Sequence, residues 1–360
     1  MATLTKESIL DSVRTVQDPD LHRDIVSLGM VKDVMIEDGK ISVHVQLTTP
    51  ACPLKEQIKQ EVERAVSKLE GVREVAVQMS SSVRSGPAGP ASTMPAGIKN
   101  VIAVASGKGG VGKSTVCVNL AVALARSGAS VGLMDGDIYG PNIPLMLGVP
   151  ADRRPDVTED EKIIPLEAYG LKMISMGVLV PAETPMIWRG PMLHSAVTQF
   201  LQKVDWGELD YLLVDLPPGT GDVQLSLVQT VSVTGAVIVT TPQEVALMDV
   251  RKGIAMFQKT NVPILGIVEN MSSFICPHCE KHTPIFSQGG GKEAAGRFEV
   301  PFLGEIPIDP RIREGGDTGK PILVEHPDSP AAKQFESVAG FLAQQVSIVN
   351  VLGPTSWKKP

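Results

Sequence analysis

Residues 101–115 read VIAVASGKGGVGKST, an apolar run followed by a glycine-rich segment. Residues 107–114 fit the phosphate-loop pattern G-x-x-x-x-G-K-[ST], in which glycines let backbone N–H groups turn toward a polyphosphate. Lys113 would neutralise the β- and γ-phosphates, and the Ser114 hydroxyl would bind Mg²⁺. A glycine-rich turn without a ligand is the alternative, but a strand predicted before the loop and a helix predicted at 114–127 supply the context that the motif requires. We therefore predict an ATP site formed by Gly107, Lys108, Gly109, Gly110, Val111, Gly112, Lys113, Ser114 and Thr115.

Further apolar runs follow the phosphate loop at intervals. They are SVGLMD (130–135), YLLVDL (211–216), AVIVTT (236–241) and ILGIVEN (264–270). Such short, near-continuous apolar runs are typical of strands buried on both faces of a parallel sheet. Helices are expected at 190–203 and 245–259, and a last one near 329–347. The sequence therefore predicts the α/β class: a doubly wound, mostly parallel P-loop NTPase domain over residues 98–348, with a C-terminal tail at 349–360.

The first 80 residues follow a different pattern, which predicts a separate small α+β domain at 1–80. Its expected elements are helices at 5–16 and 54–69 and strands at 31–37, 40–47 and 72–79. Asp38-Gly39 between the first two strands is a hairpin signal. Residues 81–97, SSVRSGPAGPASTMPAG, have no apolar period and predict a flexible linker.

Composition limits the class of function. Of 360 residues, 43% are apolar and 20% charged, which allows a normal globular core. The net charge is −7 and no run of Lys or Arg stands out, which argues against nucleic acid as a partner. The apolar stretches are far shorter than the ~20 residues that span a bilayer, and the N-terminus lacks an apolar signal segment. We expect a cytoplasmic protein with reduced thiols that binds neither nucleic acid nor membrane.

Carboxylates follow two of the predicted strands. Asp135 and Asp137 come at the carboxyl end of one strand, where open sheets place their ligands, and Asp215 ends another as a Walker-B-like residue near Mg²⁺. We predict that Asp137 positions the attacking water or a Mg²⁺-bound water, with Asp135 in support; a pair of turn aspartates is the alternative. Asn270 ends the apolar run 264–270 and resembles an asparagine that contacts adenine in ATPases with a similar phosphate loop. This resemblance implies that Asn270 contacts the base, with residues 306–313 on the base's other side.

Cys276 and Cys279 form a CPHC pair, predicted in a loop at 271–284 just beyond a strand. Two thiols three residues apart can bind one metal, and zinc would be possible if His278 or His282 supplied a further ligand, for example as Cys276, Cys279 and His282. A redox dithiol is a second alternative. A [4Fe–4S] cluster needs about four thiolates, and a symmetric dimer would bring two such pairs to one axis. We favour a bridging cluster.

The other two cysteines are less informative. Cys117 falls on the helix after the phosphate loop and is expected to be a small buried residue. Cys52 lies at a strand-to-helix junction, where a helix N-terminus lowers a thiol's pKa. It is therefore either structural or a reactive or metal-binding thiol.

Lys108 adds a second lysine to the phosphate loop. The loop resembles the deviant phosphate loop of the dimeric ATPases that include arsenite-pump, septum-site, plasmid-partition and nitrogenase-iron proteins. In that class the second lysine crosses the dimer interface to the partner's nucleotide and stabilises charge on the γ-phosphate. The resemblance implies this role for Lys108; a solvated surface lysine is the alternative. The catalytic set predicted in this way is Lys108, Lys113, Asp137 and Asp215.

Several motifs together resemble the Mrp/ApbC family of iron–sulfur cluster carrier ATPases. They are GKGGVGKST (107–115), LMDGDIYGPNIP (133–144), MIWRGPM (186–192), DWGELDYLLVDLPPGTGD (205–222), ENMSSFICPHC (269–279) and PIDPRIREGGDTGKP (307–321). The segments DPDLHRDIVSLGMV (18–31) and LTTPACP (47–53) resemble the small domain of iron–sulfur assembly proteins. The resemblance implies a homodimer with an ATP site in each subunit and a labile cluster bridged by Cys276 and Cys279. Eukaryotic relatives carry an additional N-terminal cysteine set that this sequence lacks.

We therefore predict an ATPase that carries an iron–sulfur cluster, works with other assembly factors and hands the cluster to apo-proteins. The alternatives are a partition or division-positioning ATPase and a zinc-binding P-loop ATPase without cluster transfer. The first often ends in a basic amphipathic membrane helix, whereas residues 335–360 contain only Lys358 and Lys359 as basic residues.

Overall fold

The computed structural model describes residues 4–86, 96–137, 140–179, 190–219, 224, 228, 232–276, 278–279 and 281–353, with side chains from 195 onward in the segment that begins at 190. The chain divides into two compact units, Met1–Arg84 and Ser85–Pro360. Each unit has its own sheet.

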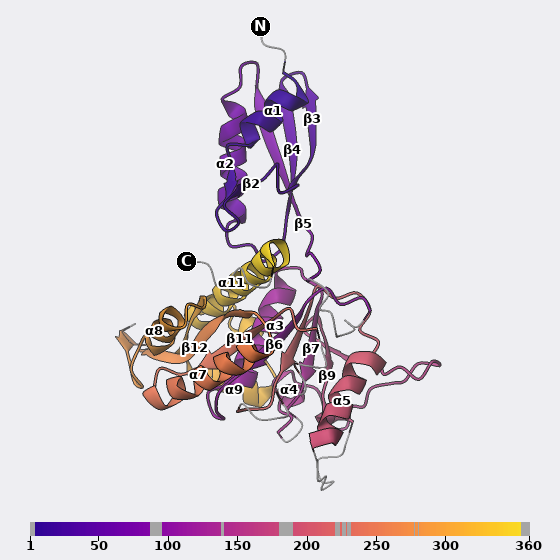
Figure 1. The fold of residues 1–360 in the computed structure, drawn as a ribbon, viewed down its shortest axis with the longest axis vertical. Coiled ribbons are helices and arrows are strands. Elements are labelled where there is room, and N and C mark those ends of the chain that lie inside the picture. The colour runs from indigo at the N-terminus through magenta and orange to yellow at the C-terminus, as the bar shows by residue number, and fades with distance from the viewer. Residues whose placement is uncertain are drawn as a thin grey trace. The chain divides into compact units, whose positions relative to one another are not determined.

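The first unit is a three-stranded sheet covered by helices (Figure 1). Its elements are α1 Lys6–Val13, β1 Gln17–Asp18, β2 Arg23–Asp24, β3 Val31–Glu37, β4 Lys40–Leu47, α2 Lys55–Ser67 and β5 Glu74–Ser81. The order is β3-β4-β5, with β3 antiparallel and β5 parallel to β4. The turn between β3 and β4 places Asp38 and Gly39 at φ +46° and +80°, the left-handed region that the Asp-Gly pair tolerates. Helix α2 buries Ile58, Val62 and Val66, one residue per turn, as the spacing predicts.

The second unit is built on a large sheet. Its elements are β6 Val101–Ala105, α3 Lys113–Arg126, β7 Val131–Asp135, α4 Ile143–Met146, β8 Leu166–Ala168, β9 Leu171–Ile174, a 3₁₀ turn Met176–Val178, α5 Gly190–Lys203, β10 Tyr211–Asp215, β11 Gly235–Thr240, α7 Glu244–Lys259, β12 Ile264–Ile275, β13 His282–Thr283, α8 Gly290–Arg297, β14 Phe302–Ile308, α9 Pro310–Thr318, α10 Ile322–Glu325 and α11 Pro330–Leu352. Within the described residues the strand order is β13-β12-β11-β6-β10-β7-β9-β8, and β14 also pairs with β12. The central strands are parallel, and the edge strands β8 and β13 are antiparallel.

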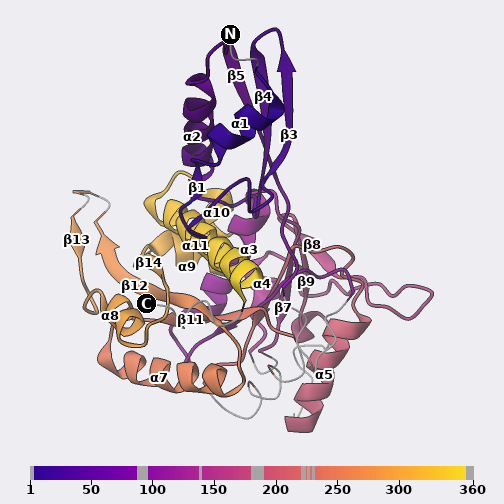
Figure 2. The ribbon, with the colours of Figure 1, turned by 45° about the horizontal axis from the view of Figure 1, so that its top comes forward.

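Helices cover both faces of this sheet. Figure 2 shows α3 and α11 on one side of it and α7 on the other; α3 packs on α11, and α7 packs on β11. All residues of β6, β7, β10 and β11 are buried, as the continuous apolar runs predict. This confirms the predicted fold class, a doubly wound, mostly parallel α/β domain preceded by a small α+β unit.

The last helix, α11, is the one described helix long and apolar enough to cross a membrane by length and composition. It packs against α3 and β14, and eleven of its 23 residues are buried there, among them Phe335, Leu342 and Val346. Such burial is what a core helix shows.

Candidate nucleotide site and cysteine pair

The phosphate loop connects the buried strand β6 to α3. Gly110 and Gly112 have φ of +82° and +79°, in the left-handed region, and Gly112 is the residue before the helix. A side chain on Gly107 would collide with α7, since an added Cβ would lie 2.5 Å from the carbonyl carbon of Asp249. The glycines are therefore required by backbone conformation and close packing. They leave the N-terminus of a 14-residue helix open toward the loop, which favours an anion.

Three polar side chains meet at the start of α3. The Lys113 ammonium lies 2.6 Å from Asp215 Oδ1, and the Ser114 hydroxyl donates to Asp215 Oδ2 at 2.6 Å. Lys113 is only 6% exposed and Asp215 is fully buried. Burial raises the pKa of Asp215, while the adjacent Lys113 ammonium opposes that rise. Sequence motifs 100 residues apart thus meet at one buried ion pair.

Asp135 lies beside Asp215 because β7 and β10 are neighbours in parallel register. Its Oδ2 accepts a hydrogen bond from Ser175 Oγ at 2.9 Å, and its Oδ1 accepts from the backbone N–H of Asp137 at 3.1 Å. Burial raises the pKa of Asp135 to about 8, and the charge of Asp215 adds to the rise. The half-buried Asp137 lies two residues after the end of this strand. The two predicted acidic segments therefore meet at the same edge of the sheet as Lys113.

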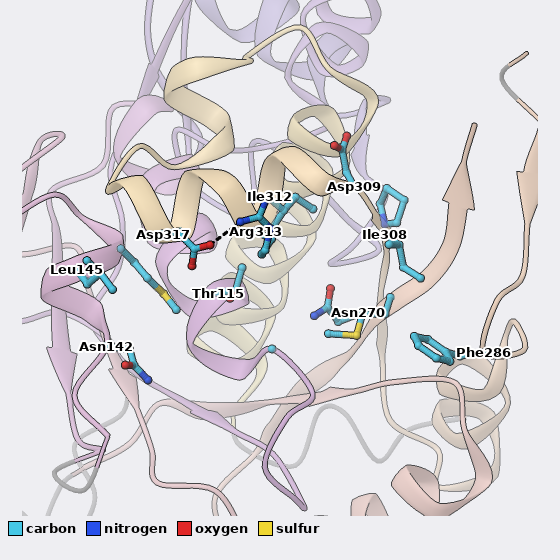
Figure 3. Close-up of a pocket in the computed structure, with 15 residues that line it drawn as sticks. Thr115, Asn142, Leu145, Asn270, Phe286, Ile308, Asp309, Ile312, Arg313 and Asp317 are labelled. Carbon is cyan, nitrogen blue, oxygen red and sulfur yellow. Dashed lines mark hydrogen bonds and ion pairs between the residues drawn. The ribbon is translucent and has the colours of Figure 1, made fainter. Parts of the chain in front are cut away.

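An apolar cavity of about 460 Å³ lies beside the phosphate loop (Figure 3). Asn270 on β12 is 6% exposed, lines the cavity, and donates through Nδ2 to Val111 O at 2.9 Å. Residues 307–309, 312 and 313 also line it, and they belong to the segment 306–313 that was expected beside the base. The full lining is Gly112, Thr115, Asn142, Leu145, Met146, Asn270, Met271, Phe286, Pro307, Ile308, Asp309, Ile312, Arg313, Gly316 and Asp317. Its size and apolar lining suit a nucleotide base.

The sequence did not reveal four lining residues, which come from α4 and from the second half of α9. Leu145 and Met146 come from α4, and Gly316 and Asp317 from α9; the two helices pack closely where Gly148 meets Gly319. Nothing in their spacing marks them as lining residues, although Gly316 and Asp317 lie within the motif at 307–321 that resembles the family.

The cysteine pair lies at the end of a β-hairpin, which corrects the prediction of a loop over 271–284. Strand β12 continues to Ile275 and pairs with β13, and the N–H of Cys276 donates to Lys281 O at 3.1 Å. The strand passes an irregularity at Met271, whose φ is +56°. Cys276 is half-buried and Cys279 exposed. Hydrogen bonds from the backbone N–H groups of His278 and Cys279 and from the Cys279 side chain lower the pKa of Cys276, so the two cysteine side chains are neighbours.

The zinc alternative would need at least one further ligand beside Cys276 and Cys279. Across the described residues, no group of three or more His, Cys, Asp and Glu side chains is placed to hold a metal ion. His282 instead has Nδ1 3.4 Å from Ser273 Oγ.

Two further cysteines are described. Cys117 is completely buried, as predicted. Burial raises the pKa of Cys52 to about 11, so desolvation outweighs the effect of the neighbouring helix N-terminus on this thiol.

A second cavity, of about 420 Å³, lies beside Cys276. Ile275 and Cys276 line it from the hairpin, residues 307–311 from the β14–α9 turn, and Pro330 from the start of α11. Three of these residues, Pro307, Ile308 and Asp309, also line the nucleotide cavity. The two cavities therefore share one wall.

The two units of the chain match two known protein families. Residues 97–343 match the family model described as NUBPL iron-transfer P-loop NTPase. The chain belongs to this family of iron-transfer P-loop NTPases. Residues 6–78 match a second family, described as iron-sulfur cluster assembly protein.

Relatives of this iron-transfer NTPase carry consistent names. The chain is 52% identical over 344 residues to the iron-sulfur cluster carrier protein of Deinococcus radiodurans, covering 95% of this chain and 96% of the relative. It is 53% identical over 254 residues to the iron-sulfur cluster transfer protein NUBPL of Dictyostelium discoideum, covering 71% and 79%. These matches confirm the resemblance inferred from the sequence motifs.

Among solved structures, a nucleotide-binding protein from Archaeoglobus fulgidus in complex with ADP matches this iron-transfer NTPase with a TM-score of 0.58 and 40% identity, covering 67% of this chain and 93% of that one. The septum site-determining protein MinD from Pyrococcus horikoshii, complexed with Mg-ADP, matches with a TM-score of 0.50 and 27% identity, covering 67% and 94%. The chain is therefore a nucleotide-binding P-loop NTPase of the cluster-carrier family.

Proposed function

We propose that this NTPase hydrolyses ATP, holds a labile iron–sulfur cluster between two copies of itself in the cytoplasm, and transfers the cluster to apo-proteins. The observation that carries the proposal is the path of β12. Asn270 in this strand lines the nucleotide cavity, and Cys276 directly follows the strand's last residue. One strand thus connects the nucleotide cavity with the cysteine pair, six residues apart.

The residues at the phosphate loop fit Mg²⁺ and ATP. The Ser114 hydroxyl and the nearby carboxylates of Asp215 and Asp137 are hard oxygen donors, which Mg²⁺ prefers. Bound Mg²⁺ would supply positive charge at the β- and γ-phosphates. Lys113, now paired with Asp215, would turn to the phosphates, and Asp137 would orient the attacking water. The adenine would lie in the cavity lined by Asn270.

A second copy of the chain completes both sites in this proposal. Lys108 would reach the partner's nucleotide and stabilise charge on its γ-phosphate. Each chain offers two thiolates, Cys276 and Cys279, and a [4Fe–4S] cluster takes about four. A two-fold axis through the hairpins would supply them. The acceptors would be apo iron–sulfur proteins, reached together with other assembly factors.

Nucleotide and cluster would be coupled through the wall that their cavities share. Pro307, Ile308 and Asp309 line both cavities, so a nucleotide that moves this turn also moves the surroundings of Cys276. Coupling requires that cluster affinity differs between nucleotide states, and nucleotide affinity must then depend on the cluster.

The test is cluster transfer from reconstituted protein to an apo-ferredoxin with ATP, with ADP and without nucleotide. We expect the transfer rate to depend on the nucleotide, and Lys113→Ala to remove that dependence while keeping the cluster. Cys52→Ala is the matched cysteine control and should behave as the unsubstituted protein. Equal transfer rates under all three conditions would refute the coupling.

A further inference from the structure

The cavity beside Cys276 is separate from the nucleotide cavity except for their shared wall. Its lining is Ile275, Cys276, Pro307, Ile308, Asp309, Pro310, Arg311 and Pro330. We propose that this cavity binds the segment of the acceptor protein that carries the incoming cysteine, with apolar side chains next to that cysteine occupying it. The inference rests on the proposed function, because it names the partner that the cysteine pair would serve.

The chemistry of transfer places the acceptor here. An acceptor thiol loses its proton and its sulfur forms a bond to an iron, while the bond between that iron and Cys276 Sγ breaks. The Cys276 thiolate takes up the proton, so atoms and charge balance and no electron is transferred. The acceptor backbone must therefore pass within one side-chain length of Cys276. Because Cys276 lines this cavity, an acceptor segment that reaches Cys276 would lie next to the cavity.

The lining favours an apolar occupant. Five of the eight residues are Ile or Pro. The two charged residues neutralise each other: Arg311 donates to both carboxylate oxygens of Asp309, at 2.9 Å from Nε to Oδ1 and 2.6 Å from Nη2 to Oδ2. A charged segment would lose hydration here without finding an unpaired opposite charge, because Asp309 and Arg311 already pair with each other. An apolar side chain would instead bury apolar surface against the Ile and Pro side chains.

The cavity is also preorganised. Pro307, Pro310 and Pro330 have φ fixed by their rings, and the last two are the first residues of α9 and α11. Little conformational freedom is then lost when a segment binds. Its volume of about 420 Å³ falls within the range of sites that bind small ligands, roughly 300–1,000 Å³.

The experiment places a carboxylate at the mouth of the cavity. Pro330 and Pro310 are exposed first-turn residues, where glutamate is well tolerated, so Pro330→Glu and Pro310→Glu should fold. Ser337→Glu is the matched control, because it adds the same charge to α11 at an exposed position about 10 Å farther along the helix and outside the lining. Pro330→Ala keeps the site apolar.

The full-length proteins are reconstituted anaerobically, and transfer to an apo-ferredoxin is measured against acceptor concentration. We expect both glutamate variants to keep iron content and ATPase activity but to need at least tenfold more acceptor for half-maximal transfer. Ser337→Glu and Pro330→Ala should match the unsubstituted protein. Unchanged concentration dependence in both glutamate variants would overturn the proposal.

Two other outcomes would show which of the two proposals, the acceptor site or the proposed function, is wrong. Loss of iron together with dissociation of the dimer in both glutamate variants would show that a second copy of the chain occupies the cavity, which overturns the acceptor assignment alone. If the unsubstituted protein binds no iron after reconstitution, the proposed function is refuted. The proposed acceptor site is then refuted as well, because it rests on that function.

Discussion

Replacing Asp135 by asparagine should remove a specific pH dependence of stability. Asp135 is 1% exposed, and burial raises its pKa to about 8. In the unfolded chain an aspartate loses its proton above pH ~3.9. Between these values the folded state holds one proton more than the unfolded state, so the free energy of unfolding falls as pH rises. Asparagine has no proton to lose and removes this contribution.

The magnitude follows from the size of the pKa shift. One retained proton contributes about 1.4 kcal/mol for each pH unit, so the stability of Asp135→Asn relative to the unsubstituted protein should rise by about 4 kcal/mol from pH 5 to pH 8. The hydrogen bonds can be kept: Oδ1 of asparagine accepts from the Asp137 N–H, and the Ser175 hydroxyl can turn to accept from the side-chain amide. At pH 5 the variant should therefore be about as stable as the unsubstituted protein.

The assay is urea unfolding of nucleotide-free protein at several pH values, followed by circular dichroism. The relevant quantity is the difference in unfolding free energy between the two proteins, because contributions from other titrating groups largely cancel in it. A difference that stays constant from pH 5 to pH 8 would refute the reasoning, since it would mean that Asp135 is ionised in the folded protein throughout this range.

Three further substitutions test the nucleotide site. Lys113→Ala should weaken ATP binding at least tenfold in calorimetry, because the phosphates lose their buried cation; unchanged affinity would contradict the assignment. Lys108→Ala should keep ATP binding but lower the hydrolysis rate about 100-fold or more, measured by phosphate release, and a normal rate would remove the trans-acting role. Asp137→Ala should also bind ATP and hydrolyse it about 100-fold more slowly; equal loss of binding and rate would instead point to a role in holding Mg²⁺.

The fold around the candidate nucleotide site was largely predictable because its signals are local. The β6–loop–α3 unit rests on glycines, a lysine and an apolar strand that lie within 26 residues, and α5 was predicted with the bounds it has. The buried strands of the parallel sheet were also predictable, because each is a short apolar run in the sequence.

Features that depend on distant partners were not predictable. Strand β12 runs five residues past the expected end because β13 and β14 supply hydrogen-bond partners that the local sequence does not reveal. The contact of Asp135 with Asp215 depends on β7 and β10 being neighbours, which follows from strand order. The sequence position of Cys52 predicts a lowered pKa, whereas burial by the surrounding fold raises it.

The most direct test of the account is the number of iron atoms bound per two chains after anaerobic reconstitution. We predict about four iron atoms per dimer, one shared [4Fe–4S] cluster, and a loss of this iron in Cys276→Ala and in Cys279→Ala with the fold retained. Dimers mixed from the unsubstituted chain and a chain lacking both cysteines should also fail to hold the cluster. Retention of iron by Cys276→Ala, or about four iron atoms on a strictly monomeric chain, would contradict the account.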